Sequence, residues 1–240
     1  MSTVPVAVED QARVEGGRSN ETQANQFYAL LVAVAIVSMT AFVALTAALL
    51  NHVVFAFDQP ILAYFHAWDG WPALWNGVSQ SANLPLIGIG VGLVVFLVWK
   101  HHYHEAVIVV GLLVAVTAGS EGVKELTARV RPAGNGDGIP GVVYSYPSGH
   151  ILECLTILGT VTIRFWRTSG RHLLRVVLLV AVVIEVILVG IARMALDEHY
   201  PTDVLGGLFG AVTALCVYAW FTRLGGWAGP PATNAVPAND

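Results

Sequence analysis

Three short blocks of the sequence hold side chains that could together cleave a phosphate ester. The blocks are KELTARVRP, from Lys124 to Pro132, PSGH, from Pro147 to His150, and ARMALDEHYPTD, from Ala192 to Asp203. The residues suited to this chemistry are three cations, two imidazoles and one carboxylate: Lys124, Arg131, Arg193, His150, His199 and Asp203. Cations stabilise charge on phosphoryl oxygens, one imidazole can attack phosphorus, and a second can protonate the leaving oxygen.

The third block predicts a nucleophilic histidine. His199 and Asp203 are four residues apart, a spacing that on a helix places the two Cβ atoms on one face, about 5–6 Å apart. Asp203 could then hold one ring nitrogen of His199, fix the tautomer and direct the other nitrogen outward. The alternative is a buried structural pair.

The second block is typical of a helix start. Pro147 suits the first turn, Ser148 is a good N-cap residue, and the free amides that follow form an anion site. His150 would point into the same space, where it could give a proton to a leaving oxygen. Simple capping by Ser148 and a structural role for His150 are the alternatives.

The basic residues of the first and third blocks could neutralise a phosphoryl group. Arginine does so with a planar, two-pronged donor, and both Arg131 and Arg193 could act in this way beside Lys124. Any of them could instead extend its side chain to the membrane interface. For Arg129, which lies between the positions of interest, we favour the interfacial interpretation.

The composition places this chemistry in a membrane. Hydrophobic residues make up 55% of the 240 residues and charged residues 12%, with a mean hydropathy of +0.66. This balance indicates an integral membrane protein. The net charge of −4 gives no support to nucleic-acid binding. Cys154 and Cys216 both fall in apolar runs, where a buried, inert thiol is expected.

We expect an all-α integral membrane bundle of six transmembrane helices. Their predicted ranges are 27–50, 84–99, 106–123, 148–165, 173–194 and 201–221, with short interfacial helices in the aromatic stretch 52–83. Residues 27–224 would form one domain. The polar segments 1–26 and 225–240 read as disordered cytoplasmic tails.

The basic residues also predict the orientation, because short cytoplasmic loops accumulate Lys and Arg. Placing both tails in the cytoplasm assigns eight of these residues to the inside and four to the outside. Three of the four outside residues, Lys124, Arg131 and Arg193, are the cations assigned to the chemistry above. All three blocks then lie on the outer face of what we expect to be the plasma membrane.

The blocks resemble the type 2 phosphatidic acid phosphatase (PAP2) superfamily, whose pattern is Lys-x6-Arg-Pro, Pro-Ser-Gly-His and Ser-Arg-x5-His-x3-Asp. The resemblance implies that His199 forms a phosphohistidine, His150 protonates the leaving group and Asp203 orients His199. It assigns phosphate binding to Lys124, Arg131, Ser148, Gly149 and Arg193, and it implies neither a metal nor another cofactor. Ala192 departs from the pattern, because the family has Ser there.

The expected activity is hydrolysis of a lipid phosphate or diphosphate drawn from the bilayer. Prenyl diphosphates, phosphatidic acid and phosphatidylglycerophosphate all fit. A phosphotransferase that uses the same histidine and a non-enzymatic lipid-phosphate binder are the alternatives. Glu153 and Glu185 lie inside predicted spans, where a carboxyl usually faces a partner or a wet cavity. We hypothesise that Glu153 raises the pKa of His150 and keeps it protonated. A protonated or locally paired packing residue is the alternative. For Glu185 the sequence indicates no role.

Overall fold

The computed structural model describes residues 6–68, 70–133 and 144–223, and the fold within them is helical apart from one isolated β-bridge between Val130 and Tyr144. The helices are α1 (Val6–Leu50), α2 (Asp58–His66), α3 (Pro72–Ser81), α4 (Leu84–Trp99), α5 (Tyr103–Thr127), α6 (Gly149–Thr168), α7 (His172–Ala195) and α8 (Pro201–Arg223). The predicted all-α class is confirmed for these residues.

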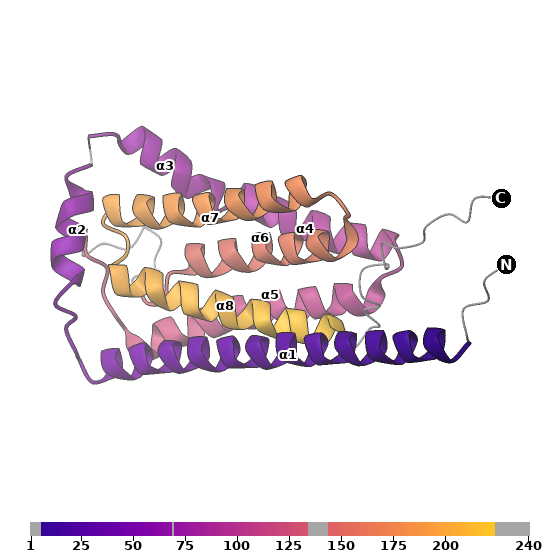
Figure 1. Ribbon diagram of the computed structural model, residues 1–240. Coiled ribbons are helices and arrows are strands. Elements are labelled where there is room, and N and C mark those ends of the chain that lie inside the picture. Colours follow the sequence, from indigo (N-terminus) through magenta and orange to yellow (C-terminus); the bar gives the residue numbers. More distant parts are fainter. Residues whose placement is uncertain (1–5, 69, 134–143, 224–240) are drawn as a thin grey trace.

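The long helices lie side by side, and α2 crosses one end of the bundle (Figure 1). Helix α6 occupies the middle, where it packs against α4, α5, α7 and α8. The start of α1 and the end of α8 both lie at the end opposite α2 (Figure 1). The connections between α5 and α6 and between α7 and α8 therefore share the α2 end.

Five segments among the described residues are long and apolar enough to cross a membrane: Asn25–Leu50, Pro72–Trp99, Tyr103–Thr127, His172–Ala195 and Pro201–Thr222. Their outer surfaces carry exposed apolar side chains such as Val37, Val107 and Val183, as expected of helices that face lipid. The protein is a multi-pass membrane protein.

The predicted sixth span, 148–165, corresponds to α6, which is not one of these five segments. Its position explains the difference. Because other helices surround α6, its side chains meet protein more than lipid, and Thr156 and Thr160 are buried there. Such a helix needs less apolar character than one in contact with acyl chains.

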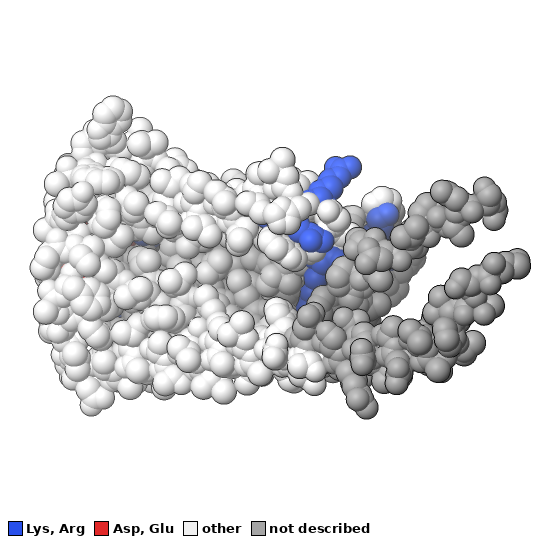
Figure 2. Space-filling model, viewed as in Figure 1, with Lys and Arg blue, Asp and Glu red and all other residues white. Residues whose placement is uncertain are grey.

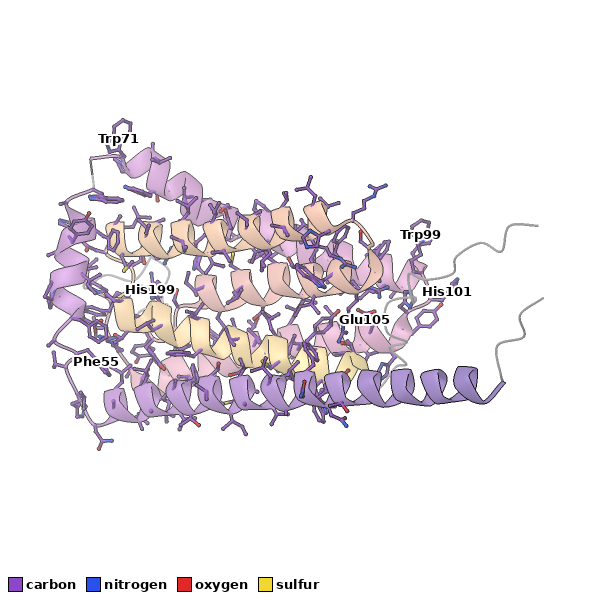
Figure 3. All side chains as sticks on the ribbon, in the orientation of Figure 1. Phe55, Trp71, Trp99, His101, Glu105 and His199 are labelled. Carbon is purple, nitrogen blue, oxygen red and sulfur yellow. The ribbon has the colours of Figure 1, made fainter. Side chains whose placement is uncertain are left out.

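The aromatic stretch before α4 forms helices, as the sequence predicts, and the second of them, α3, runs directly into α4. Helices α3 and α4 together form the apolar segment Pro72–Trp99. Trp68 and Trp75 stack with their ring centroids 6.0 Å apart, and Trp71 projects at the same end of the molecule as His199 (Figure 3). Rings of this kind favour the headgroup level of a bilayer.

The tails differ from the sequence analysis where they are described. Helix α1 begins at Val6, so most of the predicted disordered segment 1–26 is helical. Residues such as Ala, Glu, Gln and Arg, which are frequent there, favour helix. The predicted disordered segment 225–240 lies outside the described residues.

Basic side chains gather at the end opposite α2. On the face drawn in Figure 2, Lys and Arg atoms appear toward the junction of α6 and α7, while much of the remaining surface lacks charged atoms. The sequence places Arg164, Arg167, Arg171 and Arg175 around this junction. Basic residues at this junction are what the sequence predicts for the cytoplasmic side of a membrane.

Candidate active site

The predicted site residues come together at the end of the bundle that α2 crosses. They reach it from the end of α5, the segment after α5, the start of α6, the end of α7 and the start of α8, and Figure 3 shows His199 near this end. The His150 ring interacts electrostatically with His199 and with three cations, Arg193, Lys124 and Arg131. Residues far apart in the sequence thus form one cluster of imidazoles and cations.

The start of α8 holds the carboxylate of Asp203 in place. Pro201 is the first residue of the helix, and Asp203 Oδ2 accepts a hydrogen bond of 2.7 Å from the Tyr200 backbone amide. This is the reciprocal half of a capping box, in which the third helical residue bonds back to the N-cap amide. Asp203 therefore has a fixed orientation before any substrate binds.

His199 lies in the turn before α8, not on the helix as its spacing from Asp203 suggests. Its Nδ1 is 3.6 Å from Asp203 Oδ2, slightly longer than a hydrogen bond. In the described part of the chain, Nδ1 has no hydrogen-bond partner. Catalytic hydrogen bonds are often long in unliganded enzymes and tighten when substrate binds.

The surroundings of His199 keep its imidazole neutral. Burial lowers the pKa of His199, Asp203 raises it, and the charge of Arg193 lowers it, and together they bring the pKa to about 4. A neutral imidazole has a free electron pair on one nitrogen, which a nucleophile requires.

Arg129 lies in a polar network behind Asp203, and its interfacial interpretation is wrong. Its Nη1 donates to Asp203 Oδ1 and to Thr202 Oγ1, both at 2.6 Å, and its Nη2 donates to Asp58 Oδ2 at 2.6 Å. The guanidinium also lies over the Tyr200 ring. Arg129 and the Tyr200 amide together bind both oxygens of Asp203.

Asp58 connects this network to α2. Its two carboxylate oxygens accept hydrogen bonds from the backbone amide and the hydroxyl of Thr202, at 2.9 and 2.6 Å. Asp58, Thr202 and Asp203 are all buried, so each charged group needs a partner. The start of α8 is therefore fixed by both α2 and Arg129.

The start of α6 is open to an anion. Ser148 is the N-cap residue but makes no capping hydrogen bond, and its buried Oγ has no partner among the described residues. Lys124 Nζ lies 3.5 Å from the point that a Cβ of Gly149 would occupy, and Ser120 Oγ 4.0 Å from it. Hydroxyls, a cation and helix-terminal amides thus meet around Gly149.

Glycines bring α8 close to the start of α6. A Cβ on Gly207 would stand 2.6 Å from the Ser148 carbonyl oxygen, and one on Gly206 would stand 2.4 Å from the ring of Tyr146. The Ser148 amide in turn donates to the Asp203 carbonyl oxygen at 3.0 Å. Gly206 and Gly207 therefore allow α8 to pack closely against Tyr146 and Ser148.

Carboxylates contact the three predicted phosphate-binding cations. Glu198 Oε2 accepts hydrogen bonds from Arg131 Nη1 and from Arg193 Nη2, the latter at 3.2 Å. Lys124 Nζ donates to Glu121 Oε1 at 2.6 Å, and the side chain of Glu121 is mostly exposed. One oxygen of Glu198 therefore bridges the two arginines.

A hydroxyl from another helix supports Arg193 despite the alanine at position 192. Arg193 Nη1 donates to Ser79 Oγ at 3.0 Å, and both residues are buried. Ala192 itself is fully buried and packs with Trp75 and Ala195. Ser79 of α3 therefore gives Arg193 a hydroxyl partner.

The two intramembrane carboxyls have partners of their own. Glu153 accepts a hydrogen bond from Thr117 Oγ1 at 3.1 Å, and Glu185 accepts one from Ser81 Oγ at 2.5 Å. These contacts tie α6 to α5 and α7 to the end of α3. The influence of Glu153 on His150 stays a prediction.

Sequence reasoning missed Asp58, Ser79, Ser120 and Glu198. Asp58 and Ser79 are 144 and 114 positions from their partners, and no local pattern marks them. The sequence did offer one indication for Glu198, because this residue directly precedes His199 inside the third block.

Comparison with known proteins agrees with this arrangement. The profile of the PAP2 superfamily matches residues 104–225, which include all three blocks. The fold is similar to the crystal structure of the first transmembrane PAP2 type phosphatidylglycerolphosphate phosphatase from Bacillus subtilis. The TM-score is 0.63 and the identity 16%, over 79% of this chain and 96% of that one. No curated protein matches the chain.

Proposed function

The chain belongs to the PAP2 superfamily, and from this premise we propose that it hydrolyses the phosphate or diphosphate group of a membrane lipid. The observation that carries the proposal is the cluster of His199, Asp203 and His150 with the cations around them. Such a cluster combines a nucleophile, an acid and charge stabilisation for phosphoryl transfer.

In the proposed reaction, His199 attacks phosphorus in line with the bond to the leaving oxygen. The P–O bond breaks, His150 gives its proton to that oxygen, and a phosphohistidine forms. Water then attacks this intermediate, gives a proton to His150 and releases inorganic phosphate. Lys124, Arg131, Arg193, Ser148 and the amide of Gly149 hold the phosphoryl oxygens throughout.

We also propose that α6 crosses the membrane within the bundle, which gives six spans with both ends of the chain in the cytoplasm. The basic residues around the junction of α6 and α7 support this orientation. The active site then faces the outside of the plasma membrane. Lipid phosphates in the outer leaflet would reach it without crossing the bilayer.

Phosphate release from lipid phosphates tests the proposal. The purified chain is incubated in detergent and chelator with phosphatidic acid, phosphatidylglycerophosphate and a prenyl diphosphate, beside the variants His199→Ala and His150→Ala. We expect the wild type to release phosphate from at least one lipid, and His199→Ala to lose about a thousandfold or more of the rate. His150→Ala should lose about 10²–10⁴-fold, and less with an activated aryl phosphate.

The same assay separates the alternatives. A phosphotransferase would label an added alcohol and release little free phosphate. A lipid-phosphate binder would release none from any lipid, and full activity in His199→Ala would contradict the proposed nucleophile.

A further inference from the structure

Glu198 occupies the place between two guanidinium groups that a phosphoryl group would need. A single carboxylate oxygen, Oε2, accepts hydrogen bonds from both Arg131 and Arg193. The two arginine side chains are 4% and 6% exposed, whereas that of Glu198 is 22% exposed. Glu198 is thus the most exposed of the three side chains, and the two guanidinium groups that it contacts are buried.

The backbone fixes Glu198 at this position. The amides of Glu198 and His199 both donate to the Arg193 carbonyl oxygen, at 3.0 and 3.2 Å, and Asp197 has a positive φ of 54° that reverses the chain. The turn therefore holds Glu198 beside the arginines and next to His199. Rotation of the Glu198 side chain toward solvent would separate its carboxylate from both arginines without moving the backbone.

Two buried guanidinium groups are costly without an anion nearby. When phosphate is absent, the Glu198 carboxylate supplies one. When a substrate binds, its phosphoryl oxygens need the same donors, so the carboxylate must leave. Binding is then an exchange of one anion for another.

We propose that Glu198 is a specificity-determining residue that competes with ligands for the arginine pair and so favours phosphate monoesters and terminal diphosphates over phosphodiester lipids. This inference rests on the proposed function, because it assigns Arg131 and Arg193 to the substrate's phosphate.

Charge explains the selectivity. A terminal phosphate carries about two negative charges near neutral pH, whereas a carboxylate or a phosphodiester carries one. Exchanging Glu198 for a terminal phosphate adds negative charge between the arginines, and exchanging it for a phosphodiester adds none. Specificity can come from such a penalty on the wrong ligand. The penalty matters in a membrane, where anionic phosphodiester lipids are abundant.

The test compares Glu198→Gln with Asp197→Asn. Glutamine keeps the length and hydrogen-bonding capacity of Glu198 without its charge. Asp197→Asn removes one charge from the same turn, and Asp197 contacts His66 at 2.8 Å rather than the arginines. Asparagine also tolerates the positive φ there. The readouts are KM for a short-chain phosphatidic acid and inhibition by a short-chain phosphatidylglycerol in the same micelles.

We expect Glu198→Gln to lower KM and to strengthen inhibition by phosphatidylglycerol by roughly tenfold, the effect of about 1.4 kcal/mol of lost competition. The inhibition should change more than KM. Asp197→Asn should alter neither by more than about twofold, as for an ordinary surface charge. Orthophosphate binding, measured by calorimetry without turnover, should also tighten in Glu198→Gln.

The opposite result would overturn the inference. A higher KM, weaker orthophosphate binding and unchanged phosphatidylglycerol inhibition in Glu198→Gln would mean that Glu198 orders the arginines instead of competing for them. A wild-type protein that hydrolyses no lipid phosphate would contradict the proposed function, and the orthophosphate measurement would still decide the role of Glu198.

Discussion

At the scale of single residues, the proposed nucleophile, His199, is held less firmly than the carboxylate that would orient it. His199 has a loose contact with Asp203, at 3.6 Å, whereas Asp203 is bound on one oxygen by the Tyr200 amide and on the other by Arg129. The carboxylate is therefore rigid and the imidazole can adjust. Such a division suits a nucleophile that must approach phosphorus while its orienting partner stays fixed.

The pH dependence of activity follows from the burial of His199. Its pKa lies at about 4, so protonation should disable the nucleophile only as the pH falls through about 4. Asp203 raises this pKa, and Asp203→Asn should therefore move the acid limb of kcat/KM to still lower pH while it reduces kcat. Profiles of both proteins with one substrate provide the measurement, since ionisation of the substrate is common to both. A limb that moves to higher pH would contradict this account.

A substitution of Arg129 tests whether its hydrogen-bond network behind Asp203 affects turnover. Arg129→Lys keeps the charge but cannot supply the fork that joins Asp58, Thr202 and Asp203. We expect kcat to fall by about 10–100-fold, the range for a misplaced catalytic group, with a much smaller change in KM. Lys100→Arg is the control, because Lys100 lies near the other end of the bundle against Trp99. Unchanged kcat in Arg129→Lys would limit the network to folding.

At the scale of the elements, the ends of the helices position the residues of the site. The end of α7 presents Arg193, the start of α6 presents Ser148, Gly149 and His150, and the start of α8 presents Asp203. The starts of α6 and α8 approach closely because Gly207 leaves room for the Ser148 carbonyl. The geometry of the site therefore depends on how these two helices pack.

A methyl group at this contact should separate the helices. Gly207→Ala would place a Cβ 2.6 Å from a backbone oxygen that cannot rotate away, and we expect a loss of about 1–3 kcal/mol of stability, as for overpacking elsewhere, together with most of the activity. Gly88→Ala on α4 has nothing within 4 Å and should leave both unchanged. The measurements are thermal unfolding in detergent and phosphate release. Equal behaviour of the two variants would contradict the role of Gly207.

The arrangement of these elements also explains which site residues could be predicted from the sequence. The blocks around Lys124, His150 and His199 could be found because each is a local pattern at the end of an apolar segment. Asp58 and Ser79 could not, because their roles arise from the way α2 and α3 cross the bundle. The helix α6 could be predicted from the sequence, but its central position could not. That position depends on packing against four other helices and not on the hydropathy of α6.

At the scale of the whole molecule, the two ends of the bundle have different chemistry. The end crossed by α2 holds the site and Trp71, and the other end carries the basic junction of α6 and α7. A membrane protein with this asymmetry should insert in one orientation. The proposed access of outer-leaflet lipids depends on that orientation.

Labelling of introduced cysteines measures the orientation. Val54 is 84% exposed at the α2 end, and Gly170 lies in the open turn between α6 and α7. A membrane-impermeant maleimide should label Val54→Cys in intact cells and Gly170→Cys only after lysis. Cys154 and Cys216 are buried and serve as the unlabelled background. The reverse pattern would place the site in the cytoplasm.

The central claim is that a histidine, and not water, first attacks phosphorus. The stereochemical course of hydrolysis tests it most directly, using a lipid phosphorothioate made chiral with oxygen isotopes and cleaved in water of a third isotope. Two successive in-line displacements, first by His199 and then by water, predict retention of configuration in the released thiophosphate. Inversion would mean a single direct attack by water and would contradict the account.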